Sequence, residues 1–473
     1  MSTECTQERF DFHPLNRREV VARFDGGEIT SDAGALLLRE VERRTGILRQ
    51  LSTCFTDHRR PDLIEHSVFE LVAQRIYGLA LGYEDLNDHD RLRHDPLMGL
   101  LAGKSDPLGA DRRCEKDRGC AVAGKSTLNR LELSPAGADA RARYKKIVMD
   151  EEAIDDLLVD LFLQAHRTKP PEPIVLDLDA TDDPVHGNQE GRFFHGYFGN
   201  YCYLPLYIFS GEFLLCARLR PSNIDASYGA KEELERIVRR IRATWPTVPI
   251  VIRGDSGFCR DEIMTWCEEN GVDYVLGLAK NARLVRAIGG ELHRVQAVFE
   301  QTGQASRIFS EFFYRTKKSW SASRRVVAKA EHLSKGSNPR FVVTSLPREA
   351  MEGRPLYEDV YCARGEMENR IKEQQLALFA DRTSTAYLRS NQLRLYLSSF
   401  AYCLMQALRR LGLSGTELAK AQSQTIRLKL LKIGAQIRFT VRKVWLHLSA
   451  GHPSAELFGV AYRNLAAQPA LRC

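Results

Sequence analysis

One alternation of apolar and amphipathic segments, between residues 174 and 278, constrains the fold of this chain more than any other feature. The apolar runs predict β-strands, and the stretches with apolar side chains at helical spacing predict α-helices. In chain order these are strands at 174–179, 201–210 and 213–219, a helix at 231–243, a strand at 248–253, a helix at 260–270 and a strand at 274–278. Such an order is typical of a mixed sheet, in which an antiparallel three-strand meander precedes helix-linked parallel strands. The sequence therefore predicts an α/β core.

The remainder of the chain predicts helical regions around this core and one insertion rich in strands. A length of 473 residues is enough for two or three domains. We expect a helical region at 1–150, the first part of the core at 151–280, a β-rich basic insertion at 281–360, long helices at 361–411 and a basic C-terminal helical region at 412–473. The insertion is assigned from short strand-like runs at 308–314, 324–330 and 341–345.

The composition excludes several classes of protein. Hydrophobic residues make up 44% and charged residues 27% of the chain, as in ordinary globular proteins. No apolar run approaches the roughly 20 residues that cross a bilayer, and the polar segment Met1–Arg18 lacks the apolar core of a signal peptide. The 11 cysteines are scattered singly without a C-x-x-C pair, which argues against a zinc or redox motif. We therefore expect a cytoplasmic protein with reduced thiols.

Two segments of the chain are strongly basic. The segment 315–340 carries eight Lys and Arg residues against Glu331 alone, and 409–443 carries nine against Glu417 alone. A single such patch is as easily a solvated charged face, but two in one chain favour a polyanionic partner, with nucleic acid first in line. In the insertion, the candidate phosphate-binding residues are Lys317, Lys318, Arg324 and Arg325.

Trp320 lies among these cations, in the segment RTKKSWSASRR. An exposed aromatic ring between basic residues suits stacking on an unpaired base. A core position in a β-hairpin explains the same residue equally well, so both interpretations stand at this point.

Carboxylates follow two strands that are expected to be neighbours. Asp179 ends the first strand, and Asp255 directly follows the fourth, within RGDSGF. The carboxyl ends of parallel strands share one sheet edge, the usual place for a site in an open α/β sheet. Asp177 shares the strand face of Asp179 and is its rival for a role in such a site. Turn formation or helix capping is the alternative explanation for an aspartate after a strand.

Crowded carboxylates raise one another's pKa values unless cations neutralise them. Hard divalent ions with oxygen ligands do so, Mg²⁺ or Mn²⁺ before Zn²⁺. Two such ions about 4 Å apart can activate a water and stabilise the leaving 3′ oxygen of a phosphodiester. With a third carboxylate from a later helix, this edge of the sheet would suit two-metal chemistry on nucleic acid.

Residues 361–375 (YCARGEMENRIKEQQ) have the spacing Tyr361-x2-Arg364-x3-Glu368. This segment resembles the signature of the DDE transposases of bacterial insertion sequences. Further blocks are similar to the insertion-sequence family numbered thirteen-eighty: FDGGEITSDAG at 24–34, LDLDATDDPVHG at 176–187, VIRGDSGF at 251–258, and DRTS with NQLRL within 381–395. The resemblance covers nearly the whole chain.

The resemblance implies an RNase H-like core in which Asp179, Asp255 and Glu368 form the catalytic, metal-binding triad for two Mg²⁺ or Mn²⁺ ions. It implies cleavage at insertion-sequence ends and strand transfer into target DNA, in a bacterial, nucleoid-associated protein. The partners are then the terminal inverted repeats and target DNA, and the region 1–150 becomes a DNA-recognition region. Because both ends must be held together, the reaction itself implies a homodimer on DNA.

The chain departs from the signature at one position. The wider pattern ends in a Lys seven residues after the Glu, where this chain has Gln375. In relatives the Tyr, Arg and Lys hold DNA phosphates near a hairpin intermediate, which implies DNA contacts by Tyr361 and Arg364 here. Lys372, one turn from Glu368, could substitute for the missing Lys. From spacing alone, Arg364 and Glu368 are equally a surface i,i+4 ion pair.

Residues 119–126 (GCAVAGKS) match the phosphate-binding loop pattern G-x-x-x-x-G-K-[ST]. Such a loop must leave a hydrophobic strand, whereas the preceding residues 113–118 are RCEKDR. We therefore expect no nucleotide-binding residues. Two alternative functions remain to be weighed: a P-loop ATPase, and a DNA-binding protein with an inactive nuclease core.

Overall fold

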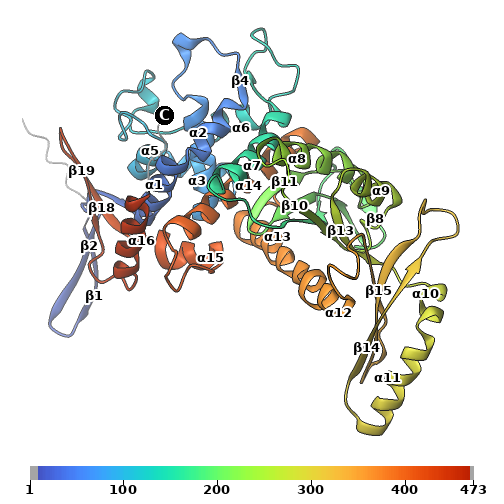
Figure 1. The fold of residues 1–473 in the computed structure, drawn as a ribbon. Helices are drawn as coiled ribbons and strands as arrows, with labels where there is room; N and C mark the ends of the chain where they lie inside the picture. Colours follow the sequence, from blue (N-terminus) through green and yellow to red (C-terminus); the bar gives the residue numbers. More distant parts are fainter. Residues whose placement is uncertain (1–8, 469–473) are drawn as a thin grey trace, which may run out of the picture. The chain divides into compact units, whose positions relative to one another are not determined.

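The structure is a computed structural model, and it describes residues 9–468 (Figure 1). The chain divides into two compact units. The first unit combines Met1–Met149 with Phe400–Cys473, and the second unit is Asp150–Ser399. Among the described residues, no helix is long and apolar enough to cross a membrane.

The second unit is built on a nine-stranded mixed sheet with the strand order β11-β10-β6-β12-β13-β17-β15-β14, and β16 pairs with β15. Its strands are β6 (Ile174–Ala180), β10 (Leu206–Ser210), β11 (Phe213–Arg218), β12 (Ile250–Gly254), β13 (Asp273–Leu278), β14 (Ser306–Tyr314), β15 (Arg324–Leu333), β16 (Gly336–Ser337) and β17 (Arg340–Thr344). Strands β6, β12 and β13 are parallel neighbours, and β10 lies antiparallel between β6 and β11. The predicted meander followed by helix-linked parallel strands is confirmed.

Helices cover one face of this sheet and irregular helical turns cover the other. Helices α7 (Glu151–Ala165), α8 (Ala230–Thr244) and α9 (Asp261–Glu269) share a core with the side chains of Ile250 and Ile252. The alternate residue Val251 packs on the opposite face with Leu356 and Tyr357. Burial on both faces explains why the central strands are nearly continuous apolar runs.

The segment 201–210, predicted as one strand, is divided in the structure. Pro205 has no N–H to donate to a sheet ladder, and the chain turns there. The first part, β9 (Asn200–Tyr203), joins a separate three-stranded sheet with β7 (Asp183–Pro184) and β8 (Phe193–His195). The second part is β10, which turns into β11 through Gly211–Glu212 as predicted, with Gly211 at a φ of 57°.

The β-rich insertion continues the core sheet. Strand β17 pairs antiparallel with β13, and β15 and β14 follow it outward to the sheet edge. The sequence predicted these three strands but missed α10 (Ala282–Ala287) and α11 (Gly289–Thr302), of which α11 packs against β14 and β15. Helix α11 buries only Val295 completely, so its apolar pattern was too weak to predict a helix.

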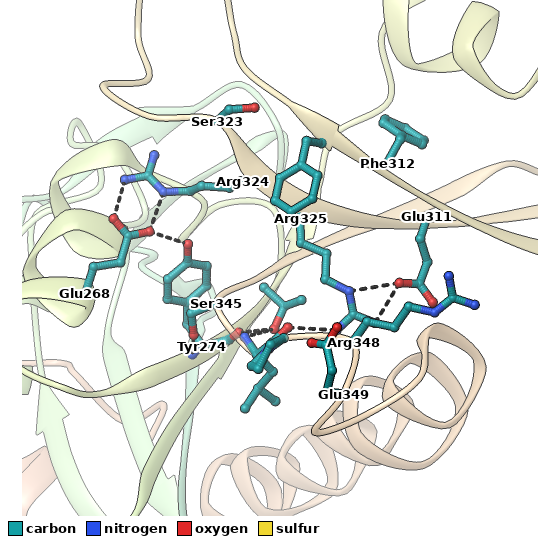
Figure 2. A pocket seen from close by; sticks show the side chains of 14 residues that line it. Glu268, Tyr274, Glu311, Phe312, Ser323, Arg324, Arg325, Ser345, Arg348 and Glu349 are labelled. Atoms are coloured by element: carbon teal, nitrogen blue, oxygen red, sulfur yellow. Dashed lines mark hydrogen bonds and ion pairs between the residues drawn. The ribbon is translucent and has the colours of Figure 1, made fainter.

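Trp320 and Arg324 are interior residues of this extension, which corrects their assignment to a DNA-binding surface. Trp320 is 5% exposed and packs edge-to-face on Tyr314, with 5.7 Å between ring centroids. Arg324 pairs with Asp261 and with Glu268, each at 2.6 Å; Figure 2 shows the pair with Glu268. The hairpin-core interpretation of Trp320 therefore describes the structure, because neither side chain is open to a DNA strand.

The Arg325 side chain is also held by an ion pair and by hydrogen bonds inside the protein. Its guanidinium pairs with Glu311 at 2.7 Å (Figure 2). It also donates to the backbone carbonyls of Leu346 and Met351. The sequence showed the positive charges but could not show that acidic side chains on α9 and β14 neutralise them. Lys317 and Lys318, in the turn between β14 and β15, are exposed.

The first unit is mostly helical but also contains strands that join its two chain segments. Strand β18 (Ala435–Phe439) pairs with β3 (Glu28–Thr30) and with β19 (Val444–Leu448), which corrects the expectation of a purely helical C-terminal region. The other strands of this unit are β1 (Arg9–Leu15), β2 (Arg18–Arg23), β4 (Phe55–Asp57) and β5 (Ile147–Met149). Its helices include α1 (Leu36–Thr45), α2 (Ile47–Thr53), α3 (Val68–Leu81), α4 (His89–Leu92), α5 (Pro96–Leu101), α6 (Lys125–Glu132), α15 (Ser423–Ile426) and α16 (Ala455–Ala467).

The segment that matches a phosphate-binding loop is a packed part of this unit. It follows a short 3₁₀ turn rather than a strand, and residues 120–123 are buried. The Gln74 side chain bonds both the N–H and the carbonyl of Ala123. Lys125 is held by Asn87 and Asp90 at 3.2 Å each. This arrangement does not support nucleotide binding.

We expect Arg324→Ala to destabilise the protein, because two carboxylates would lose the buried cation between them. Removing one partner from a buried ion pair costs about 3 kcal/mol or more, and the partly exposed acids place this case at the lower end. Chemical denaturation measures the change. Lys318→Ala, an exposed control in the adjoining turn, should leave the free energy of unfolding within about 0.5 kcal/mol. Equal stability of the two variants would contradict the interior placement of Arg324.

Candidate active site

Asp179 and Asp255 leave the sheet side by side. In the parallel pair β6–β12, the last paired residues are Leu178 and Gly254, and the two aspartates follow them directly. The Asp255 carboxylate accepts the N–H of Gly257 at 2.8 Å, which turns the chain away from the strand. The predicted meeting of these two strand ends is confirmed by the strand order.

Glu368 reaches the same edge from α13 (Gly365–Leu378), which packs against β6. Met367 and Ile371 are buried on this helix, whereas the Glu368 side chain is 47% exposed. Arg364, one turn earlier, lies 3.1 Å from the Glu368 carboxylate and 3.6 Å from that of Asp179. The i,i+4 ion pair is therefore present, but it also links α13 to the end of β6.

The electrostatics of this edge are dominated by buried negative charge. Burial raises the pKa of Asp179 to about 6; the Arg364 cation opposes the shift, and the charges of Asp255 and Glu368 add to it. A buried carboxylate with other negative charges nearby is stabilised by a cation beside it. In the structure, Arg364 supplies part of that positive charge.

Asp177, the rival of Asp179, is committed to a different partner. Its two oxygens accept from Nε and Nη2 of Arg253 at 2.6 and 2.7 Å, and Arg253 also donates to the carbonyl of Val360. Asp177 is 3% exposed. Its carboxylate thus ties β6 to β12 and to the segment before Tyr361. Arg253 was not among the residues predicted for the site, although strand alternation puts it on the face of Asp177.

Tyr361 packs where β13 carries Gly277. A Cβ atom on Gly277 would lie 2.6 Å from the Tyr361 hydroxyl and 3.0 Å from the backbone nitrogen of Ser256. Glycine is therefore required here by close approach, since any side chain would displace Tyr361 or the loop that holds Asp255.

Gln375, at the position where the signature has Lys, and Lys372, its possible substitute, differ in environment. Lys372 is exposed on α13, one turn after Glu368. Gln375 donates from Nε2 to the carbonyl of Asp182 at 3.1 Å and so fastens α13 to the loop that follows β6. Gln375 thus has a structural role in this chain.

The chemistry of this donor set suits a hard divalent ion, because all three side chains offer carboxylate oxygens. Within residues 9–468, however, no group of three or more His, Cys, Asp or Glu side chains is arranged to hold a metal ion. The guanidinium of Arg364 stands between two of the carboxylates instead. The three carboxylates are therefore suitable ligands for a hard divalent ion, and in the structure the Arg364 guanidinium supplies the positive charge beside two of them.

The sequence matches a protein family, described as "Transposase DDE domain group 1", over residues 12–470. The chain belongs to this family. It is a DNA transposase, a DDE endonuclease and strand transferase, and enzymes of this type use divalent metal ions. Among solved structures, a piggyBac transposase synaptic complex with hairpin DNA matches with a TM-score of 0.39 and 10% identity, over 85% of this chain and 80% of that chain. Comparison with curated protein sequences finds no match.

We expect Asp179→Asn to stabilise the metal-free transposase above pH 6. The folded-state pKa of about 6 lies above the ordinary 3.8, so the folded state disfavours the charged form. The stability advantage of the variant should therefore grow between about pH 4 and 6 and stay constant above. Its upper limit is about 3 kcal/mol, the equivalent of that pKa difference. Thermal unfolding in EDTA across this pH range measures it.

The matched variant at the neighbouring position is Asp177→Asn, which should lower stability at every pH in this range. It leaves the buried Arg253 guanidinium without its carboxylate partner. If Asp179→Asn is the destabilised variant and Asp177→Asn the stabilised one, the assignment of their environments is wrong.

Gly277→Ala should reduce DNA cleavage by the transposase more than it reduces stability. The new methyl group has to displace the Tyr361 hydroxyl or the backbone after Asp255, and displacements of about 1 Å near reacting groups cost on the order of 100-fold in rate. Gly290→Ala is the control, since nothing lies within 4 Å of a Cβ there. Cleavage rates and melting temperatures of both variants separate the local effect from general unfolding.

Proposed function

We propose that Asp179, Asp255 and Glu368 are the catalytic triad of this transposase. The observation that carries this proposal is the parallel β6–β12 pair, which delivers Asp179 and Asp255 to one point, with Arg364 joining Glu368 to it. On this basis the core is RNase H-like. The chain is a transposase of the insertion-sequence family numbered thirteen-eighty, acting on terminal inverted repeats and target DNA.

The triad would hold two Mg²⁺ or Mn²⁺ ions. Bound there, the ions supply activation of the attacking water or 3′-hydroxyl and stabilisation of the leaving 3′ oxygen. Asp179 and Asp255 position the donors from rigid strand ends, while Glu368 adds an oxygen from an exposed helix position. The raised pKa of Asp179 is consistent with a carboxyl group whose charged form needs such a cation.

Arg364 then has two kinds of partner in the proposed site. Without ions it neutralises Asp179 and Glu368. The same guanidinium would also suit a DNA phosphate beside the scissile bond, since arginine binds phosphate oxygens with two parallel N–H donors. Tyr361, which precedes α13, and the exposed Lys372 on α13 would bind neighbouring phosphates.

Binding of the longer DNA substrate is assigned to further regions. Lys317 and Lys318 remain proposed phosphate contacts, because their turn is exposed. The region 1–150 is proposed to recognise the element ends, and the protein to act as a homodimer on DNA in the bacterial cytoplasm, associated with the nucleoid. A dimer follows from the need to hold two ends during one cut-and-paste event.

The test is cleavage of labelled end DNA by purified protein with Mg²⁺. Asp179→Asn, Asp255→Asn and Glu368→Gln should each lower cleavage to background and retain DNA binding. Glu366→Gln is the matched control on α13, because its carboxylate is 74% exposed and pairs with Arg370. Ca²⁺ should support binding but poor cleavage, since its coordination is larger and less strict.

Nucleotide addition distinguishes the alternative functions in the same assay. Cleavage should be independent of ATP and unchanged in rate by Lys125→Ala on pre-bound DNA. Strict ATP dependence would overturn the proposal in favour of an ATPase. Binding of end DNA without nicking by the wild-type protein in Mg²⁺ or Mn²⁺ would make it a DNA-binding protein with an inactive core.

A further inference from the structure

An aromatic hairpin, defined here as residues 193–203, stands out on the surface of the second unit. It consists of β8, a turn and β9. Four of its rings are exposed: Tyr197 by 87%, Phe194 by 58%, Tyr201 by 49% and Phe193 by 42%. Isolated exposed aromatic residues are ordinary, but four within nine residues mark a binding surface.

One face of the hairpin combines two of these rings with a cation. Phe194 and Tyr201 are opposite each other in the β8–β9 register, so their side chains share a face. Their ring centroids are 5.6 Å apart with an interplanar angle of 72°. The Arg192 guanidinium lies 4.6 Å from the Tyr201 ring centroid. Flat apolar surface and positive charge are thus presented together.

The base of the hairpin is fixed firmly, so the rings are displayed on a rigid support. Tyr203 is fully buried, donates from its hydroxyl to the Glu190 carbonyl at 2.7 Å and accepts from Asn391 at 3.2 Å. Ser222 donates to the carbonyl of Phe193 at 2.9 Å. A fixed backbone reduces the conformational entropy that the hairpin loses when it binds a ligand.

The hairpin also grows from the sheet edge that carries the proposed triad. The chain leaves β6 after Ala180, forms the hairpin and returns as β10, whose first residue, Leu206, pairs with Ala180. Asn200 of the hairpin donates to Asp182, and Gln375 of α13 donates to the carbonyl of the same residue. The hairpin is therefore braced against the helix that bears Glu368.

We propose that the aromatic hairpin is a stacking site for unpaired bases of the DNA strand that is processed at the neighbouring carboxylates. The inference rests on the proposed function. Nucleobases are the ligand favoured by the observations, because every base offers a flat π face. The DNA backbone adds phosphates, whose negative charge suits the Arg192 guanidinium beside the Tyr201 ring. Sequence preference is not expected, since stacking reads no base edge.

The binding test uses a fluorescent single-stranded oligothymidine and a fully paired duplex without divalent metal. Phe194→Ala with Tyr197→Ala and Tyr201→Ala should weaken single-strand binding by roughly 5- to 150-fold for each stacked base lost. Duplex binding should stay within about twofold. Tyr197→Phe with Tyr201→Phe should retain single-strand binding, because the rings remain. Tyr462→Ala, which removes a 55% exposed ring on α16, is the surface control.

A cleavage test separates this inference from the proposed triad. On paired end DNA with Mg²⁺, the triple alanine variant should cut at least about tenfold more slowly than wild type. End DNA with mismatched bases at the cleavage site should restore most of its rate, since the bases are already unpaired. Glu368→Gln should fail on both substrates, and activity of that variant would contradict the triad alone.

Two results would overturn the stacking site. One is single-strand binding by the triple alanine variant equal to wild type. The other is a loss of self-association by that variant, measured by light scattering, with unchanged binding of both DNA forms. That result would make the hairpin a contact between two copies of the chain.

Discussion

The buried ion pair between Asp177 and Arg253 is the interaction on which the geometry of the site depends. It joins β6 to β12, and through the Val360 carbonyl it also fixes the chain just before Tyr361. One guanidinium therefore holds the two strands that end in Asp179 and Asp255 and the segment that leads to α13. An apolar pair could stabilise the two strands equally well, but it could not hold a backbone carbonyl of a third segment. Burying this ion pair costs desolvation free energy, and in return it fixes the positions of three chain segments.

A second arginine, Arg364, neutralises negative charge at the site, whereas Arg253 fixes the position of the strands. Among the ion pairs of residues 9–468, Arg364 is the side chain that contacts both Asp179 and Glu368. Without a cation, neighbouring carboxylates repel one another and lower the stability of the fold. Arg364 supplies part of the compensating positive charge, and the same contacts hold α13 at the end of β6.

The central sheet could be predicted from the sequence because it depends on short-range patterns. These are the apolar strands, the helical spacing of apolar residues and a two-residue turn at Gly211–Glu212. The sequence also predicted which strand ends meet, since Asp179 and Asp255 follow parallel neighbours. It left Asp177 open as a rival of Asp179, because the ion-pair partner of Asp177 is Arg253, 76 residues away in the chain. For the same reason it placed Arg324 and Arg325 at the surface. Their neutralising partners, such as Glu268 and Glu311, become neighbours only in the folded sheet.

The pairing of β3 with β18 has a consequence for biosynthesis. The register joins Thr30 to Ala435, so this sheet of the first unit cannot form until residues far apart in the chain have both been synthesised. All residues of the second unit, Asp150–Ser399, leave the ribosome before β18 does. During synthesis the second unit can therefore fold while β3 still lacks its partner strand. An unpaired strand edge of this kind is a feature that makes incomplete chains prone to aggregate and to bind chaperones.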